Sequence, residues 1–463
     1  MTEIILRDYQ QDAVAAVRQA YARACRAPLL CSPTGSGKTV IFGFVAMNAV
    51  ARGGRVLILA HRKELIRQTS ATLADFGVDH GLIVPGEPAT LHGVQVASVQ
   101  TIVRRLERLD WAPSLIVVDE AHHATSGSGH GKVLEHFAGA KVLGVTATPA
   151  RLDGRGLGVR VGGFFDALVQ GPSVAELVAA GYLSRPRVFA PPGAPDLSGV
   201  RSVAGDFRKS DLAGLMDKAV ITGSAVDHYQ RWCPGEPAIA FCASVAHAEH
   251  VAAAFSAAGY RAASIDGRQD DVTRAGRIAD LASGALQVLT SCEIVSEGTD
   301  IPIVAAAILL RPTKSLGLYL QQAGRALRPF PGKTHATILD HVGNCLRLGL
   351  PDQDREWNLD AVRRRRDALA APSSRECPVC SCVSRPIPAC PECGHVFPVV
   401  AREIEVREGD LQEVKFAAKV EERRVRAGCK TLDDLRDLGQ ARGYRPGWAE
   451  KVWRARQEWR PSR

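Results

Sequence analysis

The chain has 463 residues, which is too long for one compact core and suits about three domains of roughly 150 residues each. Its 58 Lys and Arg against 49 Asp and Glu leave a formal charge of +9, which favours a polyanionic partner, although a basic surface also serves solubility. The longest apolar runs fall far short of the roughly 20 residues that span a bilayer, and the N-terminal stretch lacks the pattern of a signal peptide. We therefore expect a cytoplasmic protein with no membrane partner.

Short aliphatic runs alternate with helical patterns over residues 1–182. This alternation predicts a parallel sheet with helices on both faces, in which ligands bind at the carboxyl ends of the strands. The expected strands are 28–31, 56–59, 94–97, 115–118 and 142–145.

The first of these strands leads into the octet Ser-Pro-Thr-Gly-Ser-Gly-Lys-Thr, which predicts a phosphate-binding loop. Gly35 and Gly37 let the backbone approach an anion, Lys38 supplies positive charge, and the Thr39 hydroxyl is a natural Mg²⁺ ligand. Ser32 stands where the strict pattern has glycine, so an ordinary turn stays open as the alternative on this octet alone. The expected nucleotide-binding residues here are Pro33, Thr34, Gly35, Ser36, Gly37, Lys38 and Thr39.

Two adjacent carboxylates, Asp119 and Glu120, directly follow the apolar strand 115–118. Asp119 can hold Mg²⁺, and Glu120 can orient and deprotonate the water that attacks a γ-phosphate. The alternative is a solvated acidic turn, which four preceding buried aliphatics make less favourable.

Three segments together resemble motifs I, II and III of the superfamily 2 helicases, namely residues 32–39, 119–122 and 146–148. The resemblance implies two tandem RecA-like lobes and an ATP hydrolase that uses Mg²⁺ and acts on nucleic acid. Residues 6–10 then resemble the adenine-reading segment, where Arg7 and Gln10 would contact the base. Residues 60–65 and 98–101 resemble the motifs that contact a nucleic-acid backbone.

A second alternation follows a stretch rich in Pro, Gly and Ser at 181–203, near whose start we place the inter-domain linker. It carries no second phosphate-binding loop, which suits a second RecA-like lobe that closes over a nucleotide held by the first. The expected strands are 238–241, 262–265, 286–290, 304–310 and 336–339.

Residues 321–328 resemble motif VI, which places Gln321 at the nucleotide and Arg325 and Arg328 at arginine-finger positions. Three residues apart on a helix, the two guanidinium groups share one face and can reach one triphosphate. A pair of surface arginines is the alternative. Gln322 departs from the motif, which often has arginine there.

Two further stretches complete the resemblance. Residues 291–302 resemble motif V, where Gly298 and Asp300 would couple the nucleotide to the strand path, and residues 241–244 resemble motif IV.

Five of the twelve cysteines crowd between 377 and 393. Two Cys-x-x-Cys knuckles nine residues apart indicate a Zn²⁺ ion closed by four thiolates, which is a structural and not a catalytic site. Cys382 could replace one ligand, and His395 is less favoured. Disulfides are the alternative, which a reducing compartment disfavours. The expected ligands are Cys377, Cys380, Cys390 and Cys393.

The end of the chain leaves two alternatives open. The arginine run 363–366 is either a solvated face or a phosphate-tracking stretch. Tryptophans at 448, 453 and 459 could stack nucleic-acid bases or dock the tail on the motor.

The sequence predicts five parts along the chain. They are a RecA-like ATP-binding domain at 1–182, a RecA-like C-terminal domain at 183–350, a basic helical linker at 351–375, a Cys₄ zinc module at 376–400 and a helical tail rich in basic and aromatic residues at 401–463.

The chain also resembles, more finely, the RadD branch of bacterial and phage superfamily 2 proteins. The resemblance is carried by the zinc module, the tail and three short segments at 311–313, 331–334 and 340–344. This finer resemblance implies an ATP-dependent motor acting on DNA, more than on RNA, in repair or recombination, with repair or single-strand-binding proteins as partners. Three alternatives stay open: a translocase or remodeller without strand separation, the motor subunit of a restriction system, and a binding module in which ATP is only a switch.

Overall fold

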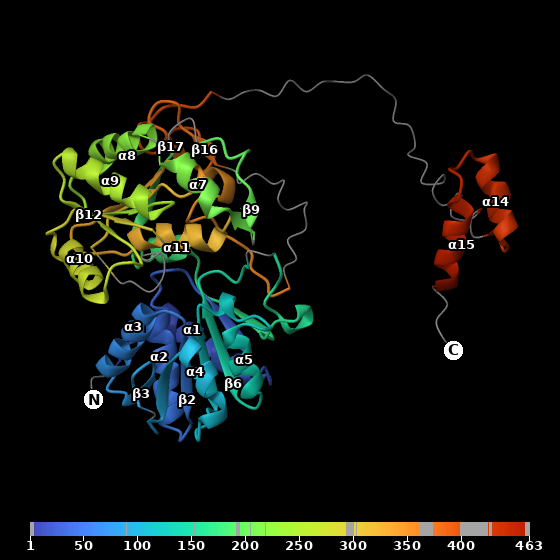
Figure 1. Ribbon diagram of the computed structural model, residues 1–463, viewed down its shortest axis with the longest axis horizontal. Helices are drawn as coiled ribbons and strands as arrows, with labels where there is room; N and C mark the ends of the chain where they lie inside the picture. Colours follow the sequence, from blue (N-terminus) through green and yellow to red (C-terminus); the bar gives the residue numbers. More distant parts are fainter. Residues whose placement is uncertain are drawn as a thin grey trace. The chain divides into compact units, whose positions relative to one another are not determined.

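The computed structural model describes residues 4–88, 90–151, 154–190, 195–203, 205–217, 219–292, 301, 303–360, 374–398, 425 and 428–458. The chain divides into two compact units, Met1–Pro398 and Val399–Arg463. The first unit contains two lobes, each built around its own sheet (Figure 1).

The first lobe is a seven-stranded parallel sheet in the order β3-β4-β2-β5-β6-β1-β7. Its central strands are buried along their whole length, as expected where helices cover both faces. Helices α1, α2 and α3 pack on one face, and α4 and α5 pack on the other. The strands are β1 (Pro28–Cys31), β2 (Val56–Ala60), β3 (His80–Ile83), β4 (Val94–Ser98), β5 (Leu115–Asp119), β6 (Lys141–Thr146) and β7 (Ala167–Gln170). The helices are α1 (Asp8–Ala22), α2 (Lys38–Val50), α3 (Lys63–Asp75), α4 (Val99–Arg105), α5 (Gly129–His136) and α6 (Val174–Ala179).

The second lobe has an eight-stranded sheet in the order β12-β13-β11-β14-β15-β8-β17-β16. The first six strands of this order are parallel, and β17 and β16 continue the sheet antiparallel. The strands are β8 (Arg185–Phe189), β11 (Ala238–Phe241), β12 (Ala262–Ile265), β13 (Val288–Ser291), β14 (Ala306–Leu309), β15 (His335–Asp340), β16 (Arg375–Glu376) and β17 (Cys382–Ser384), with a separate hairpin of β9 (Ser202–Val203) and β10 (Asp206–Phe207). The helices are α7 (Lys209–Met216), α8 (Ala219–Trp232), α9 (Val245–Ala257), α10 (Asp271–Ser283), α11 (Leu316–Ala326) and α12 (Asn344–Leu348).

The two tandem α/β lobes confirm the predicted fold class, and every predicted strand is present. Strand β8 was not predicted, because proline and glycine dominate the sequence that follows it. Its proline is tolerated since Pro186 pairs with Ala336 on one side, while β17 pairs only with Val188 and Phe189 on the other. The described part of the zinc-module segment therefore belongs to the second sheet.

A strap formed by residues 351–360 connects the lobes a second time, after the linker around Tyr182. The guanidinium of Arg355 donates to the carbonyl oxygens of Leu348 and Leu350 in the second lobe and to that of Gln353 within the strap. The Leu359 carbonyl accepts hydrogen bonds from the Leu157 and Gly158 amides of the first lobe at 2.8 and 2.9 Å. These anchors hold the chain extended, and the prediction that the linker is helical is wrong for residues 351–360. The arginine run 363–366 lies outside the described residues.

The second unit contains a helical hairpin of α14 (Leu432–Ala441) and α15 (Trp448–Glu458). The ring of Trp448 lies 4.5 Å from that of Tyr444, and an ideal Cβ on Gly439 would lie 3.4 Å from the Trp448 ring. Arg436 also pairs with Glu450 at 2.9 Å. Trp448 is therefore part of the hairpin's own packing, whereas position 459 lies outside the described residues.

The strap requires a close backbone approach that a side chain would block. A Cβ atom at Gly156 would lie 2.0 Å from the Leu359 carbonyl oxygen, whereas one at Gly139 would meet nothing within 4 Å. We expect Gly156→Ala to lower the free energy of unfolding by about 1–3 kcal/mol, in the range of other overpacked sites, and to make the strap sensitive to protease. Denaturant unfolding and limited proteolysis measure both effects, with Gly139→Ala as the control. Equal stability and protection in the two variants would contradict the strap as described.

Candidate active site at the lobe interface

A cavity of about 390 Å³ lies between the two lobes and gathers most of the predicted nucleotide-site residues. Both lobes contribute charged side chains to it. Pro33 instead lines a smaller neighbouring cavity, and Ser36 is buried within the loop. Gly298 and Asp300 lie outside the described residues. The predicted residues that line the cavity are Arg7, Gln10, Thr34, Gly35, Gly37, Lys38, Thr39, Asp119, Glu120, Gln321, Arg325 and Arg328.

The loop between β1 and α2 has the conformation that a phosphate-binding loop requires. Gly35 and Gly37 have φ values of 87° and 75°, which side-chain-bearing residues rarely adopt. Helix α2 begins directly afterwards at Lys38, so its first amides and its dipole face the cavity. The Ser32 hydroxyl donates to the Ser36 hydroxyl at 2.7 Å, so the serine that departs from the strict pattern closes the loop internally.

The ammonium of Lys38 lies against the backbone of this loop. It donates to the carbonyl oxygens of Ser32 and Pro33, both at 3.2 Å. Burial lowers the pKa of Lys38, and the charges of Glu120 and Asp119 oppose this effect. An anionic ligand in the cavity would stabilise the charged ammonium in the same way.

The two carboxylates follow β5 in a strained turn. Glu120 has φ 49° and ψ 51°, a left-handed conformation that is uncommon outside glycine and that clusters at functional sites. The Asp119 carboxylate accepts a hydrogen bond from the Glu120 amide at 2.9 Å. His122 Nδ1 lies 3.4 Å from Glu120 Oε2 and 3.1 Å from the Thr146 hydroxyl. His122 therefore connects the carboxylate turn to the end of β6.

Helix α11 brings the second lobe to the same cavity and lies on the side of that lobe facing the first (Figure 1). Arg325 and Gln321 are only 6% and 3% exposed. Among the described residues, the Gln321 Nε2 atom has no hydrogen-bond partner although it is buried. An ideal Cβ on Gly35 would lie 3.5 Å from Arg328 Cγ, so this arginine reaches the phosphate-binding loop of the other lobe. Buried cations beside an unsatisfied amide donor fit an anionic ligand.

The far end of the cavity is shaped by the segment before α1. The Gln10 side chain accepts from the Arg7 amide at 3.0 Å and donates to the Ser36 carbonyl at 3.3 Å. The Arg7 guanidinium lies 4.8 Å over the ring of Tyr182 in the inter-lobe linker. Sequence analysis missed Tyr182, although an aromatic residue at the linker is a usable signal. It also missed three residues of α3 that line the cavity, Leu65, Gln68 and Thr72.

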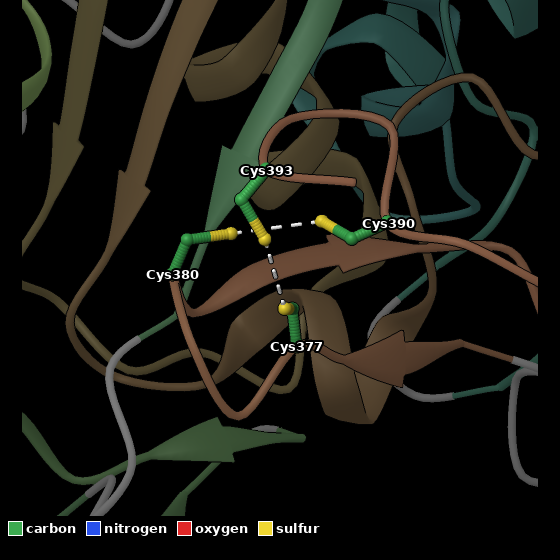
Figure 2. A group of neighbouring side chains, drawn as sticks. All are labelled: Cys377, Cys380, Cys390 and Cys393. Carbon is green, nitrogen blue, oxygen red and sulfur yellow. Dashed lines mark hydrogen bonds between the residues drawn. The ribbon is translucent and has the colours of Figure 1, made fainter. Parts of the chain in front are cut away.

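The predicted zinc ligands converge on one point, as Figure 2 shows. The sulfur atoms of Cys377 and Cys393, and those of Cys380 and Cys390, lie 3.6 Å apart, and all four are within 4.8 Å of one another. A tetrahedral zinc site with Zn–S bonds of about 2.3 Å places its sulfurs about 3.8 Å apart, whereas a disulfide needs about 2.05 Å. The thiols therefore fit Zn²⁺ and exclude the disulfide alternative within this cluster.

The two alternative zinc ligands, Cys382 and His395, lie outside this group of four. Their backbone carbonyls instead accept hydrogen bonds from the amides of Cys377 and Cys390, both at 2.8 Å. They hold the knuckles in place without entering the set of ligands.

Comparisons with known proteins bear on the two lobes and the cavity between them. Residues 3–151 match the family model described as the res subunit of type III restriction enzymes, and residues 225–329 match that of the helicase conserved C-terminal domain. A 51.5 kDa protein of a Lactococcus phage is 31% identical over 393 residues, covering 84% of this chain and 82% of the phage protein. The putative ATP-dependent helicase IRC3 of Saccharomyces cerevisiae is 31% identical, over 73% of this chain and 52% of its own length.

The chain belongs to the superfamily 2 helicases. It is accordingly an ATP-hydrolysing enzyme. A fragment of a putative HsdR subunit of a type I restriction enzyme from Vibrio vulnificus has the same fold, with a TM-score of 0.60, 21% identity, and coverage of 76% of this helicase and 67% of that chain. Within the described part of this helicase, no helix combines the length and apolarity needed to cross a membrane.

The zinc site lies against the second lobe, which makes its loss measurable. Because β17 pairs with β8 and the Cys377, Cys380 and Cys390 side chains pack in the core beneath it, metal loss should loosen the edge of the sheet. We expect Cys390→Ser/Cys393→Ser to lose one bound zinc per chain and to melt about 5–10 °C lower, at about 2–4 °C per kcal/mol for a domain of this size. Elemental analysis and thermal melting measure this, with Cys429→Ser as the thiol control. Full zinc content or an unchanged melting temperature would count against the site.

Proposed function

We propose that this helicase is a DNA-dependent ATPase motor of the RadD branch, acting in DNA repair or recombination. The observation that carries the proposal is the shared cavity, because ATP bound there touches both lobes and its hydrolysis separates them. The sequence phrases that resemble the RadD branch and the four-thiol site support the finer placement.

The residues of the first lobe bind ATP and activate the water that attacks it. Lys38 and the loop amides hold the β- and γ-phosphates. Thr39 and Asp119, which both supply oxygen donors to the cavity, would hold Mg²⁺, whose charge would neutralise that of the phosphates. Glu120 accepts the proton of the attacking water, and its strained backbone fixes the carboxylate's direction.

The residues of the second lobe complete the site. Arg325 and Arg328 stabilise the charge that develops on the transferred phosphoryl group, and Gln321 donates its unsatisfied amide hydrogen to it. At the other end, Arg7 and Gln10 contact the adenine. DNA bound across both lobes brings these halves together, so it should stimulate hydrolysis.

A second candidate function is the motor subunit of a restriction system, which the match of residues 3–151 to the res subunit model favours. Incubating supercoiled plasmid with the protein, ATP and Mg²⁺, alone and with candidate partner subunits, tests it, because ATP-dependent cutting of the plasmid would favour a restriction motor. Strand-displacement and triplex-displacement assays then separate unwinding from translocation, because only unwinding requires opened base pairs.

Glu120→Gln keeps the shape of the side chain and removes its basicity. We expect it to bind ATP with affinity within about threefold of the wild type and to hydrolyse it at least about 10²-fold more slowly, in the range of general bases. A nucleotide-binding titration and a steady-state ATPase assay distinguish the two quantities. If affinity collapses together with the rate, Glu120 has another role.

Arg325→Lys tests the two-lobe mechanism directly. An ammonium lacks the forked donors of a guanidinium, so the variant should lose about 10³-fold or more in hydrolysis and should respond weakly to single-stranded DNA. The measurement is the ATPase rate with and without single-stranded DNA, beside Arg108→Lys, an exposed arginine remote from the cavity. Stimulation and maximal rates equal to those of the wild type would refute the proposal that the second lobe completes the site.

A further inference from the structure

The end of helix α11 is held by a lysine that the ATP mechanism above does not use. The last carbonyl groups of a helix have no partner inside it. Here the Ala326 and Arg328 carbonyls accept hydrogen bonds from Lys333 Nζ, the second at 2.7 Å, and the Leu327 carbonyl accepts from the Ser184 amide at 2.7 Å. The carbonyl groups of Ala326, Leu327 and Arg328, at the end of α11 and directly after it, are therefore satisfied by donors from outside the helix.

The chain after α11 folds back to make this contact. Gly332 has φ 85°, and the Lys333 amide donates to the Phe330 carbonyl at 3.1 Å. The ammonium of Lys333 also lies 5.3 Å from the centre of the Phe330 ring. A cation at a helix C-terminus is favourable because it faces the negative end of the helix dipole.

The third donor of the ammonium reaches another part of the lobe. Lys333 Nζ donates to the Val304 carbonyl at 2.8 Å, so all three of its N–H groups are used. Val304 precedes β14 and follows residues 291–302, the stretch that resembles motif V. Lys333 thus joins the end of the motif VI helix to the segment that leaves motif V.

We propose that Lys333 is a positioning residue for ATP hydrolysis, whose ammonium fixes the end of α11 so that Arg325 and Arg328 face the phosphates. This inference rests on the proposed role of the two arginines. A displacement of about 1 Å in a catalytic group costs on the order of 10²-fold in rate. Loss of two hydrogen bonds at the end of the helix, together with the one to Val304, is a sufficient cause of such a displacement.

The charge state of Lys333 supplies a further readout. Burial lowers the pKa of Lys333 to about 7, with the Glu236 charge opposing this effect and the Arg328 charge reinforcing it. His335 on β15, Arg185 and Arg187 on β8, and Glu392 are further charged or titratable groups in this neighbourhood. The protonated form has three donors and the neutral amine has two, so the positioning effect should weaken as the pH rises through about 7.

The first experiment compares Lys333→Met with Lys132→Met, an exposed lysine of the first lobe. In the full-length protein with saturating single-stranded DNA, Lys333→Met should reduce kcat about 10–100-fold, while KM for ATP and the affinity for a non-hydrolysable ATP analogue stay within about threefold. The ratio of wild-type to Lys333→Met kcat should fall as the pH rises above about 7. A kcat within twofold of the wild type, or a ratio independent of pH, would overturn the proposal.

The second experiment places Lys333→Met in an Arg325→Ala/Arg328→Ala background and measures single-turnover hydrolysis. No further loss is expected, because Lys333 acts through those arginines, whereas a further 10–100-fold loss would show that it acts elsewhere. If the Arg325→Ala/Arg328→Ala variant alone hydrolyses ATP at the wild-type rate, the proposed role of the two arginines is wrong. That outcome is distinct from a failure of the Lys333 proposal. Should Lys333→Met not fold, Lys333→Arg serves instead, and it must keep its activity above pH 7 where the wild type declines.

Discussion

The charge excess of the inter-lobe cavity is the constraint on which the rest of this structure depends. Four cationic side chains face two carboxylates there, and two of the cations come from each lobe or its leading segment. Such an excess of like charge is unfavourable until an anion binds. Burial lowers the pKa of Lys38, with a smaller contribution in the same direction from the charge of Arg325. A triphosphate with its Mg²⁺ brings negative charge to both halves at once, so binding energy is converted into closure of the lobes.

Ion pairs from α10 also connect the lobes. Asp271 pairs with the largely exposed Lys63 at 3.4 Å and Arg67 at 3.5 Å, and Arg274 lies 3.9 Å from Glu64 in a more buried pair. Exposed ion pairs contribute about 0–1 kcal/mol. The strap is a stronger connection, because Leu359 accepts two backbone hydrogen bonds and packs against the core of the first lobe. It limits how far the lobes separate without determining how tightly they close.

The parts of the fold that sequence analysis predicted are those that local chemistry determines. Apolar runs marked the buried strands, and Gly35 and Gly37 marked a loop whose backbone only glycine adopts readily. The prediction that Arg325 and Arg328 share one helical face is wrong, because α11 ends at Ala326 and Arg328 follows it, although both arginines line the cavity. Cysteine spacing predicted all four thiols because each knuckle is a local turn.

Long-range contacts account for the elements that the sequence did not predict. Strand β8 contains a proline and is stabilised by β15 and β17, which lie far from it in the chain. The strap is extended only because Gly156 and Gly158 leave room for Leu359, a partner some 200 positions away in the sequence. Lys333 reads as an ordinary surface lysine in a proline-rich turn, and only the fold brings three carbonyl groups to its ammonium.

The zinc site is best understood through the sheet edge that it covers. Without β17, strand β8 would present unpaired backbone groups, which is a site for unwanted strand pairing. The knuckles place β17 there, and Arg187 on β8 pairs with Glu392 beside the second knuckle at 2.7 Å. The strap and the zinc module are both anchored on the second lobe, the strap through Arg355 and the module through β16 and β17. Zn²⁺ bound by the four thiols would therefore stabilise the edge of the second sheet, so its removal should loosen β17 before it impairs the binding of nucleotide.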